Sequence, residues 1–378
     1  MKMIRLLAYA LLLAAISPCQ AADKLAQDLG EQVIQLPISL PQGGGDMTLT
    51  IYHPTAAGPH PLLVLSHGRA AKPEDRAKPE RQRMEVAARY FLRKGFVVLV
   101  PTRIGYGASA SGIDPESSGN CRRPDYRAAL APQVRQIEAA LAYGRKLPDV
   151  DPQRVVLAGV SVGGIGTAAA AAENPPGVVA AINFSGGHGG NPKTHPGMPC
   201  DPEQLRAVYA EFGQRSRVPM LWLYARNDQF FGPRYSQAWA QAYHAAGGEL
   251  EYKLLPDFGA DGHKLFSEGA DIWMPLAEDF LTRFGFKQQG YAPRPAPSGF
   301  AALEDRARIP YLKEADKQKG YGDFLASQLP RAFALSANGR WGRAYGPDAA
   351  DRALDYCRRD NREKCALYAI DRDVVWKP

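Results

Sequence analysis

Two hydrophobic patterns alternate along residues 60–285 of the 378-residue chain. Short, almost continuous runs of Val, Ile and Leu are typical of strands buried on both faces, and apolar positions spaced three or four apart are typical of amphipathic helices. The runs predict strands at 62–65, 96–100, 155–158, 178–184, 219–224 and 250–255. The spacing predicts helices at about 80–94, 126–145, 201–214, 233–246 and 267–284, with a further helix of small residues after position 161. This alternation indicates an α/β fold, a doubly wound and mostly parallel sheet covered by helices on both faces.

The chain enters this sheet through two earlier apolar stretches. Residues 33–39 and 47–53 read as strands, and the glycine-rich segment 42–46 between them is a turn signal. We expect the two strands to pair antiparallel at one side of the larger sheet.

The last part of the chain has a different pattern. Residues 287–299 are rich in proline and read as a linker. Beyond the linker, the pattern predicts a β-hairpin in which residues 331–336 pair with 340–345 around an Asn-Gly turn. A helix is expected to begin at residue 348, and two strands are expected at 365–370 and 374–376. These elements predict a small α+β module at 300–378, which binds substrate or cell wall or only packs against the larger domain.

The N-terminus has the pattern of an export signal. Lys2 and Arg5 precede an apolar run at 6–16, and small residues follow that suit cleavage after Ala21. The run is too short for a stable membrane span, and Pro18 fits poorly with the alternative of a lipid anchor on Cys19. The sequence thus predicts a signal peptide at 1–21, a catalytic domain at 22–286, the linker at 287–299 and the module at 300–378, in a periplasmic or secreted protein.

Composition and charge narrow the classes of partner. The chain is 45% hydrophobic and 22% charged, which is ordinary for a globular protein. The formal net charge is +7, and +5 once Lys2 and Arg5 are removed with the signal peptide. The arginines are scattered and form no long basic run, so we expect a solvated basic surface and no nucleic-acid partner.

The cysteines fit an oxidising compartment. Without Cys19, four remain, and an even number in an exported protein indicates two disulfides. Of the three possible pairings, we expect Cys121–Cys200 in the larger domain and Cys357–Cys365 in the module. Neither pair has a histidine at a spacing that indicates zinc, so no metal is expected.

One stretch carries a catalytic pattern. The apolar run at 155–158 leads into Gly159-Val160-Ser161-Val162-Gly163, a G-x-S-x-G motif, and a helix follows directly. The turn between strand and helix is so tight that only small residues fit beside the serine. This predicts a nucleophile elbow that presents the Ser161 hydroxyl at the edge of the sheet.

Other reactive side chains share this position at a strand end. Ligand sites of open parallel sheets lie beyond the carboxyl ends of the strands. Besides the serine, the polar residues expected there are His67, Arg103, His188, Asp228 and His263. A chance serine motif would not bring these residues with it.

The order of these residues matches a catalytic triad. A serine hydroxyl needs a base to take its proton, and an acid must hold that base in the right tautomer. In chain order, Ser161 as nucleophile, Asp228 as acid and His263 as base follow the order of elbow enzymes. Alternatives remain at this stage: His188 for the base, and Asp257 or Asp261 for the acid.

An oxyanion hole needs two backbone N–H groups. We expect one from Val162, next after the nucleophile, and one from Arg69 in the loop after the first core strand. His67 in that loop is expected to have a structural role. Residues that could line the pocket for the acyl or leaving group are Arg103, Tyr106 and His188.

These motifs resemble the α/β-hydrolase superfamily and, within it, the secreted bacterial dienelactone-hydrolase-like esterases. The resemblance covers about residues 33–285 and rests on 61–68, 105–109, the elbow at 159–164, Asp228 and His263. It implies ester hydrolysis through an acyl-enzyme without a metal or organic cofactor, on a small-molecule ester. Dienelactone hydrolases proper use a cysteine nucleophile, whereas this chain has Ser161, so a general carboxylic ester is expected as substrate.

Two other functions fit the same residues. A peptidase or amidase would use the same triad, and a hydrolase-shaped binding protein would leave the site idle. Reaction with a fluorophosphonate probe separates the idle protein from the two enzymes, and ester substrates compared with amide analogues separate the enzymes.

Overall fold

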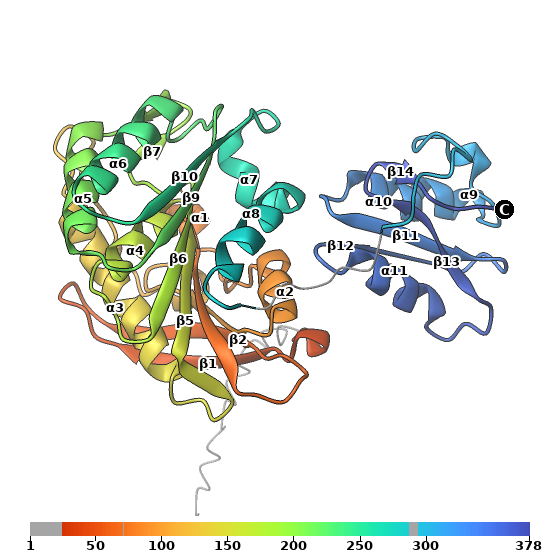
Figure 1. Cartoon of the computed structure of the whole chain (residues 1–378), viewed down its shortest axis with the longest axis horizontal. Coiled ribbons are helices and arrows are strands. Elements are labelled where there is room, and N and C mark those ends of the chain that lie inside the picture. The colour runs from red at the N-terminus through yellow and green to blue at the C-terminus, as the bar shows by residue number, and fades with distance from the viewer. Residues whose placement is uncertain (1–24, 71, 287–293) are drawn as a thin grey trace, which may run out of the picture.

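A computed structural model describes residues 25–70, 72–286 and 294–378 of the protein. Its largest part is an eight-stranded sheet with helices on both faces (Figure 1). The order across the sheet is β1-β2-β4-β3-β5-β6-β9-β10. The strands are β1 (Gln32–Ile38), β2 (Gly45–Tyr52), β3 (His60–Ser66), β4 (Val97–Thr102), β5 (Val150–Val160), β6 (Val178–Phe184), β9 (Met220–Ala225) and β10 (Leu250–Leu255).

The sheet is parallel except at the side formed by its first two strands. β1 pairs antiparallel with β2, and β2 pairs antiparallel with β4, as the early turn signal predicts. All remaining neighbours run parallel. The predicted α/β fold with a mostly parallel sheet is therefore confirmed.

Helices cover the two faces of the sheet unequally. One face packs on α3 (Tyr126–Gly144), α4 (Val162–Ala171), α5 (Pro202–Arg215) and α6 (Pro233–Ala245). The other face packs on α2 (Glu85–Arg93), α7 (Leu265–Glu268) and α8 (Ala270–Thr282). The short helices of this region are α1 (Pro73–Arg76) and 3₁₀ helices at Gln27–Leu29, Gly107–Ser109 and Gly262–Lys264.

Local chemistry explains the helix starts that the sequence predicts well. The Asp125 carboxylate accepts a hydrogen bond from the backbone N–H of Ala128 at the start of α3. The Asp201 carboxylate does the same for Gln204 at the start of α5. Each cap satisfies a backbone donor that has no partner within its helix.

Two predicted helices differ from the structure. The helix expected at 80–94 begins only at Glu85, because the preceding segment is bonded across the sheet: the Gln82 carbonyl accepts from the Thr50 hydroxyl at 3.0 Å, and Met84 has a left-handed φ of 50°. The helix expected at 267–284 is two helices, α7 and α8, separated at Gly269.

The loops on either side of the elbow strand are joined covalently. Cys121 and Cys200 form the expected disulfide, and so do Cys357 and Cys365. The loop after β6 holds a small hairpin that the sequence pattern does not predict, formed by β7 (Gly190–Asn191) and β8 (His195–Pro199).

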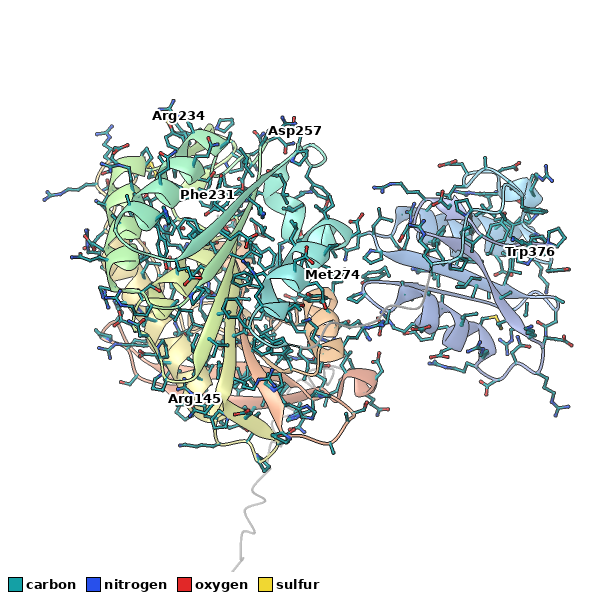
Figure 2. The ribbon with its side chains drawn as sticks, in the orientation of Figure 1. Arg145, Phe231, Arg234, Asp257, Met274 and Trp376 are labelled. Carbon is teal, nitrogen blue, oxygen red and sulfur yellow. A yellow bond between two sulfur atoms is a disulfide. The ribbon has the colours of Figure 1, made fainter. Side chains whose placement is uncertain are left out.

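The C-terminal part has its own antiparallel sheet, in the order β12-β11-β13-β14 (Figure 1). The predicted hairpin is β11 (Arg331–Ser336) with β12 (Trp341–Tyr345), followed by α11 (Ala349–Arg358), β13 (Cys365–Ile370) and β14 (Asp373–Val374). Unpredicted short helices precede it: a 3₁₀ helix at Arg306–Arg308, α9 (Glu314–Asp316), a π-helix at Lys317–Tyr321 and α10 (Gly322–Ala326). Separate hydrophobic clusters cover the two faces of this sheet, and Trp376 packs against one of them. Phe231, in contrast, belongs to the core of the eight-stranded sheet (Figure 2).

Some sequence predictions lie outside the described residues. The signal peptide at 1–21, the anchor at Cys19 and the first part of the linker, 287–293, belong to them. Within the part of the chain that the structure describes, no helix combines the length and apolar character needed to cross a bilayer. The division of the chain into domains stays a prediction.

Candidate active site

Ser161 stands at the turn between β5 and α4, in a backbone conformation that side chains rarely adopt. Its φ is 57° and its ψ is −124°. The glycines around it permit this turn: a Cβ on Gly159 would lie 2.2 Å from the Gly163 carbonyl oxygen, and a Cβ on Gly163 would lie 2.2 Å from that of His67. A strained residue held by close backbone packing is what a nucleophile elbow requires.

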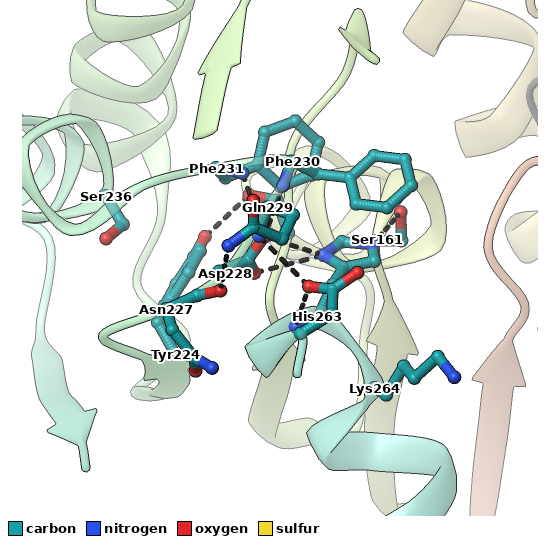
Figure 3. A network of polar contacts seen from close by, with 12 residues as sticks. Ser161, Tyr224, Asn227, Asp228, Gln229, Phe230, Phe231, Ser236, His263 and Lys264 are labelled. Carbon is teal, nitrogen blue, oxygen red and sulfur yellow. Dashed lines mark hydrogen bonds and ion pairs between the residues drawn. The ribbon is translucent and has the colours of Figure 1, made fainter. Parts of the chain in front are cut away.

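The three residues of the predicted triad lie together (Figure 3). Nε2 of His263 is 2.9 Å from Oγ of Ser161. Nδ1 of the same ring is 3.0 Å from Oδ2 of Asp228, whose side chain is fully buried. Each contact is within hydrogen-bond reach, so a proton can pass from serine to imidazole while the carboxylate holds the ring.

The Asp228 carboxylate is itself fixed by the backbone. Its Oδ1 accepts hydrogen bonds from the N–H groups of Phe230 and Phe231, at 2.8 and 2.9 Å. These two bonds fix the orientation of the carboxylate relative to the backbone of the turn. The acid is therefore placed by the turn that follows β9.

The rival acids have other surroundings. Asp261 accepts backbone N–H bonds from His263 and Gln229, at 2.9 and 3.0 Å, and so holds the histidine loop against the aspartate loop. Asp257 is two-thirds exposed and pairs with Arg226. Neither carboxylate is hydrogen-bonded to the imidazole ring of His263, whereas that of Asp228 is.

Two aromatic neighbours of the histidine were not predicted from the sequence. The Phe230 ring stacks on the His263 imidazole, with ring centroids 4.2 Å apart and planes 29° from parallel. The edge of Phe231 approaches the same imidazole at 5.4 Å. The sequence signal for them is a pair of aromatic residues two and three positions after a candidate acid.

Two backbone N–H groups flank the serine. Among the described residues, the N–H groups of Val162 and Arg69 have no hydrogen-bond acceptor. Val162 begins α4, and Arg69 follows β3, so both come from the elements expected to supply an oxyanion hole. His67 is buried behind them, where it accepts from the backbone N–H of Arg103 and contacts the Gly68 carbonyl.

A buried ion pair supports the Arg69 loop from behind. The Arg103 guanidinium bonds the Glu116 carboxylate at 2.6 Å, with both side chains fully buried, and also donates to the His67 carbonyl at 2.8 Å. Tyr106 joins this pair by donating to Glu116 at 2.7 Å. Burial, together with the nearby Arg103 cation, lowers the pKa of His67 well below its usual value, so that His67 is neutral.

The position of Arg103 differs from the prediction. It was expected to line the substrate pocket, but its side chain is fully buried beneath the loop and lines neither cavity beside Ser161. The Glu116 carboxylate and the His67 carbonyl compensate the guanidinium for the water that it loses on burial, so the charge can stay inside the wall. Tyr106, in contrast, does line a cavity, and its hydroxyl accepts a hydrogen bond from Arg69.

Two cavities meet at Ser161. The larger, of about 480 Å³, is lined on one side by Tyr106 and on the other by His263 and Phe266. The smaller, of about 290 Å³, is lined by Val162, His188 and the Cys121–Cys200 disulfide. Arg69 and Phe230 border both.

His188 is a buried wall residue of the smaller cavity. Nε2 of its ring lies 3.0 Å from the Glu116 carbonyl oxygen, which can only accept, so Nε2 carries the proton. Nδ1 is then an acceptor, and no described residue donates to it. Burial lowers the pKa of His188 to about 4, which keeps the imidazole neutral near pH 7.

Comparisons with known proteins bear on this site. The model of the dienelactone hydrolase family matches residues 80–269, which is half of the chain. The quorum-quenching protein AidA of Acinetobacter baumannii is 28% identical over 134 residues, and the match covers 35% of this chain and 38% of that protein. The chain thus matches well under half the length of this curated relative.

Solved structures of similar proteins share lower identity. A putative dienelactone hydrolase from Klebsiella pneumoniae is 18% identical, with a TM-score of 0.44 over 67% of this chain and 97% of the other. Esterase 2 of Thermogutta terrifontis, phosphoramylated by tabun, is also 18% identical, with a TM-score of 0.46 over 70% and 97%. An acylaminoacyl peptidase of Pyrococcus horikoshii is 16% identical, with a TM-score of 0.47 over 70% and 43%.

The region matched by the family model runs from the segment before α2 to Gly269, and it includes the elbow serine, Asp228 and His263. Since this match spans half of the chain, the protein belongs to the dienelactone hydrolase family.

Proposed function

We propose that the protein is an exported serine hydrolase that cleaves carboxylic esters through an acyl-enzyme. The observation that supports this best is the continuous hydrogen-bonded chain from Ser161 through His263 to Asp228. Membership in the dienelactone hydrolase family supports hydrolase chemistry in general. The serine at the elbow, in place of a cysteine, favours ordinary carboxylic esters over dienelactones.

In the first step, Oγ of Ser161 attacks the carbonyl carbon of the ester while its proton moves to Nε2 of His263. The carbonyl π electrons move onto oxygen, where the N–H groups of Val162 and Arg69 stabilise the negative charge. When the tetrahedral intermediate collapses, the bond to the alkoxy oxygen breaks. The leaving alkoxide takes the proton from Nε2, so that an alcohol departs and the acyl group remains on the serine.

In the second step, water replaces the alcohol. His263 takes a proton from water, the resulting hydroxide attacks the acyl carbon, and Ser161 leaves with that proton restored to its oxygen. Throughout, the Asp228 carboxylate accepts a hydrogen bond from the Nδ1–H group of His263 without taking its proton, and this bond stabilises the imidazolium. The products are a carboxylic acid and the free enzyme.

Export is the second part of the proposal. Two disulfides indicate an oxidising compartment. The basic and apolar start of the sequence supports a signal peptide cleaved after Ala21. Mass determination of the protein recovered from the periplasm or medium would identify the mature N-terminus, and a mass that retains residues 1–21 would contradict cleavage.

The catalytic proposal is tested with a fluorophosphonate probe and 4-nitrophenyl esters. We expect labelling at the peptide that contains Ser161, and ester turnover that exceeds turnover of the matched amides. Ser161→Ala should abolish labelling and lower kcat by several orders of magnitude, whereas Ser298→Ala, in the C-terminal part, should change neither. A labelled protein that prefers amides would be a peptidase or amidase, and an unlabelled, inactive protein would be an idle binding protein.

A further inference from the structure

The acid and the base of the proposed triad lie on two neighbouring loops. Asp228 is on the loop after β9, and His263 is on the loop after β10. The two strands pair in parallel, and this pairing ends at Ala225 and Leu255, before either loop reaches its triad residue. The distance between acid and base therefore depends on the bonds that join the two loops beyond the sheet.

Asn227, directly before the proposed acid, bonds the backbone of the loop that carries the base. Its Oδ1 accepts from the N–H of Phe258 at 2.9 Å. Its Nδ2 donates to the carbonyl oxygens of Gly259 and Phe258, at 3.0 and 3.3 Å. The backbone carbonyl of Asn227 also accepts from the N–H of Gly262, next before the proposed base, at 3.2 Å. One residue of the acid loop is thus bonded to three residues of the base loop.

Asp261 makes the connection in the opposite direction. Its Oδ1 accepts from the backbone N–H of Gln229, directly after the proposed acid, at 3.0 Å. The same oxygen accepts from the backbone N–H of His263 at 2.9 Å. A single oxygen atom therefore joins the backbone beside the acid to the backbone of the base.

The loops approach each other closely at Gly262. A Cβ on this glycine would lie 2.7 Å from Oδ1 of Asn227 and 2.9 Å from the backbone nitrogen of Asp228. At so short a separation, a shift of either loop moves the carboxylate relative to the imidazole. Misplacement of a reacting group by about 1 Å can lower a rate by about 10²-fold.

On the basis of the proposed esterase function, we propose that Asn227 and Asp261 are positioning residues. Their side chains hold the two loops so that Nδ1 of His263 meets the Asp228 carboxylate while Nε2 meets Oγ of Ser161. Both act through the backbone, because their hydrogen bonds go to backbone groups. For Asp261, the feature that matters is the place of Oδ1 and not the negative charge, since an amide oxygen can accept the same two bonds.

Two substitutions of Asp261 separate the place of the oxygen from the charge. Asp261→Glu keeps the charge but moves the oxygens by one methylene group, so kcat should fall roughly 10- to 100-fold while KM changes little. Asp261→Asn loses the charge but keeps an oxygen in place, and this conservative variant should restore kcat to within about threefold of the wild type. Steady-state kinetics on a 4-nitrophenyl ester measure both constants. An active Glu variant beside an impaired Asn variant would overturn the proposal, because the charge would then be what matters.

A double-mutant cycle with Asp228→Asn tests whether Asp261 acts through the triad. Asp228→Asn leaves the imidazole in the wrong tautomer, so the position of the ring no longer limits the rate. Asp261→Glu should then lower the remaining kcat less than about threefold, although it lowers that of the wild type at least about tenfold. Equal factors in the two backgrounds would mean independent effects and would overturn the proposal.

Asn227→Ala tests the connection from the acid loop. It removes all three side-chain bonds to the base loop, and kcat should fall at least about tenfold. Asp257→Ala is the matched control, because Asp257 is two-thirds exposed and its partner is Arg226; its kcat should stay within about twofold of the wild type. Circular dichroism shows whether a variant is folded, and Asn227→Asp, which loses the donor, replaces an unfolded Asn227→Ala. Wild-type kcat in the folded variant would overturn the role of Asn227.

Failure of the esterase function would look different. A wild-type protein that takes no fluorophosphonate label and hydrolyses no ester would refute that function, and the positioning roles with it. An active wild type whose Asp261→Glu and Asn227→Ala variants keep its kcat would refute the positioning roles alone.

Discussion

At the scale of single residues, both carboxylate oxygens of Asp228 accept hydrogen bonds. Oδ1 accepts from two backbone N–H groups, of Phe230 and Phe231, and Oδ2 faces Nδ1 of His263 at 3.0 Å. An asparagine in its place would keep its oxygen on the two backbone donors, because only oxygen can accept them. Its NH₂ group would then face Nδ1 and force the proton of the imidazole onto Nε2.

Asp228→Asn is therefore expected to fold normally and to lose activity. With Nε2 protonated, His263 cannot take the Ser161 proton, and kcat should fall roughly 10³- to 10⁴-fold while KM changes little. Steady-state kinetics on a 4-nitrophenyl ester measure both constants. Asp257→Asn is the matched control, because Asp257 is two-thirds exposed and its partner is Arg226; it should stay within about twofold of the wild type. If Asp228→Asn kept nearly full activity, another residue would have to serve as the acid.

The sequence predicts those residues of the candidate site whose position follows from their order in the chain and from the end of a strand. Ser161, Asp228 and His263 each follow a strand, so the sequence could place them at one edge of the sheet. The stacking of Phe230 on His263 was not predictable, because it depends on how one turn packs over another. The same holds for Arg103, whose position in the wall depends on Glu116, a partner thirteen residues away in an irregular loop.

At the scale of elements, the elbow and the oxyanion loop are fitted against each other. Gly163, in the first turn of α4, packs so close to the end of β3 that a Cβ there would lie 2.2 Å from the His67 carbonyl oxygen and 2.4 Å from that of Ser66. The chain after His67 carries the Arg69 N–H. The spacing between the two donors of the proposed oxyanion hole is thus set by the absence of a side chain at position 163.

Gly163→Ala should separate these two elements. Backbone atoms cannot yield as a flexible side chain does, so the loop after β3 must shift and carry the Arg69 N–H away from the oxyanion. We expect kcat to fall roughly 10²-fold or more, the usual effect of losing one oxyanion donor, while circular dichroism shows a folded protein. Gly45→Ala is the control, since the nearest atom to its added Cβ lies at an ordinary 3.5 Å. Full turnover by Gly163→Ala would argue against Arg69 as a donor.

The elements that the sequence predicts well are those with a buried side on the main sheet. The spacing of their apolar residues reflects that burial. Their capping residues, such as Asp125 and Asp201, lie next to the helix in sequence. Helix boundaries are predicted wrongly where the backbone forms hydrogen bonds with residues far away in sequence. The segment before α2 looks helical by its apolar spacing, yet its backbone is bonded to side chains of the sheet, as Gln82 is to Thr50. The short helices before β11 have too few residues to show a period.

At the scale of the whole molecule, the two disulfides serve different parts of the chain. Cys121–Cys200 joins two loops through cysteines 79 residues apart, and both cysteines line the smaller cavity at Ser161. Cys357–Cys365 joins α11 to β13, within the C-terminal part and only 8 residues apart. Among the described residues, no member of the C-terminal part lines either cavity at Ser161. The two bonds should therefore be separable by experiment.

Removal of the first disulfide by Cys121→Ser with Cys200→Ser should change both stability and selectivity. Opening so long a loop restores entropy to the unfolded chain and is expected to lower the free energy of unfolding by roughly 4–5 kcal/mol, against roughly 2–3 kcal/mol for the 8-residue loop of the second disulfide. Because the first bond lines one of the two cavities at Ser161, its loss should widen that cavity and raise the kcat/KM of octanoyl relative to butanoyl esters. Cys357→Ser with Cys365→Ser is the control and should leave this ratio unchanged. Urea denaturation followed by tryptophan fluorescence measures the stability, and the two esters measure the selectivity. If both double variants kept the wild-type ratio, the disulfide would brace the loops without limiting the length of the acyl chain.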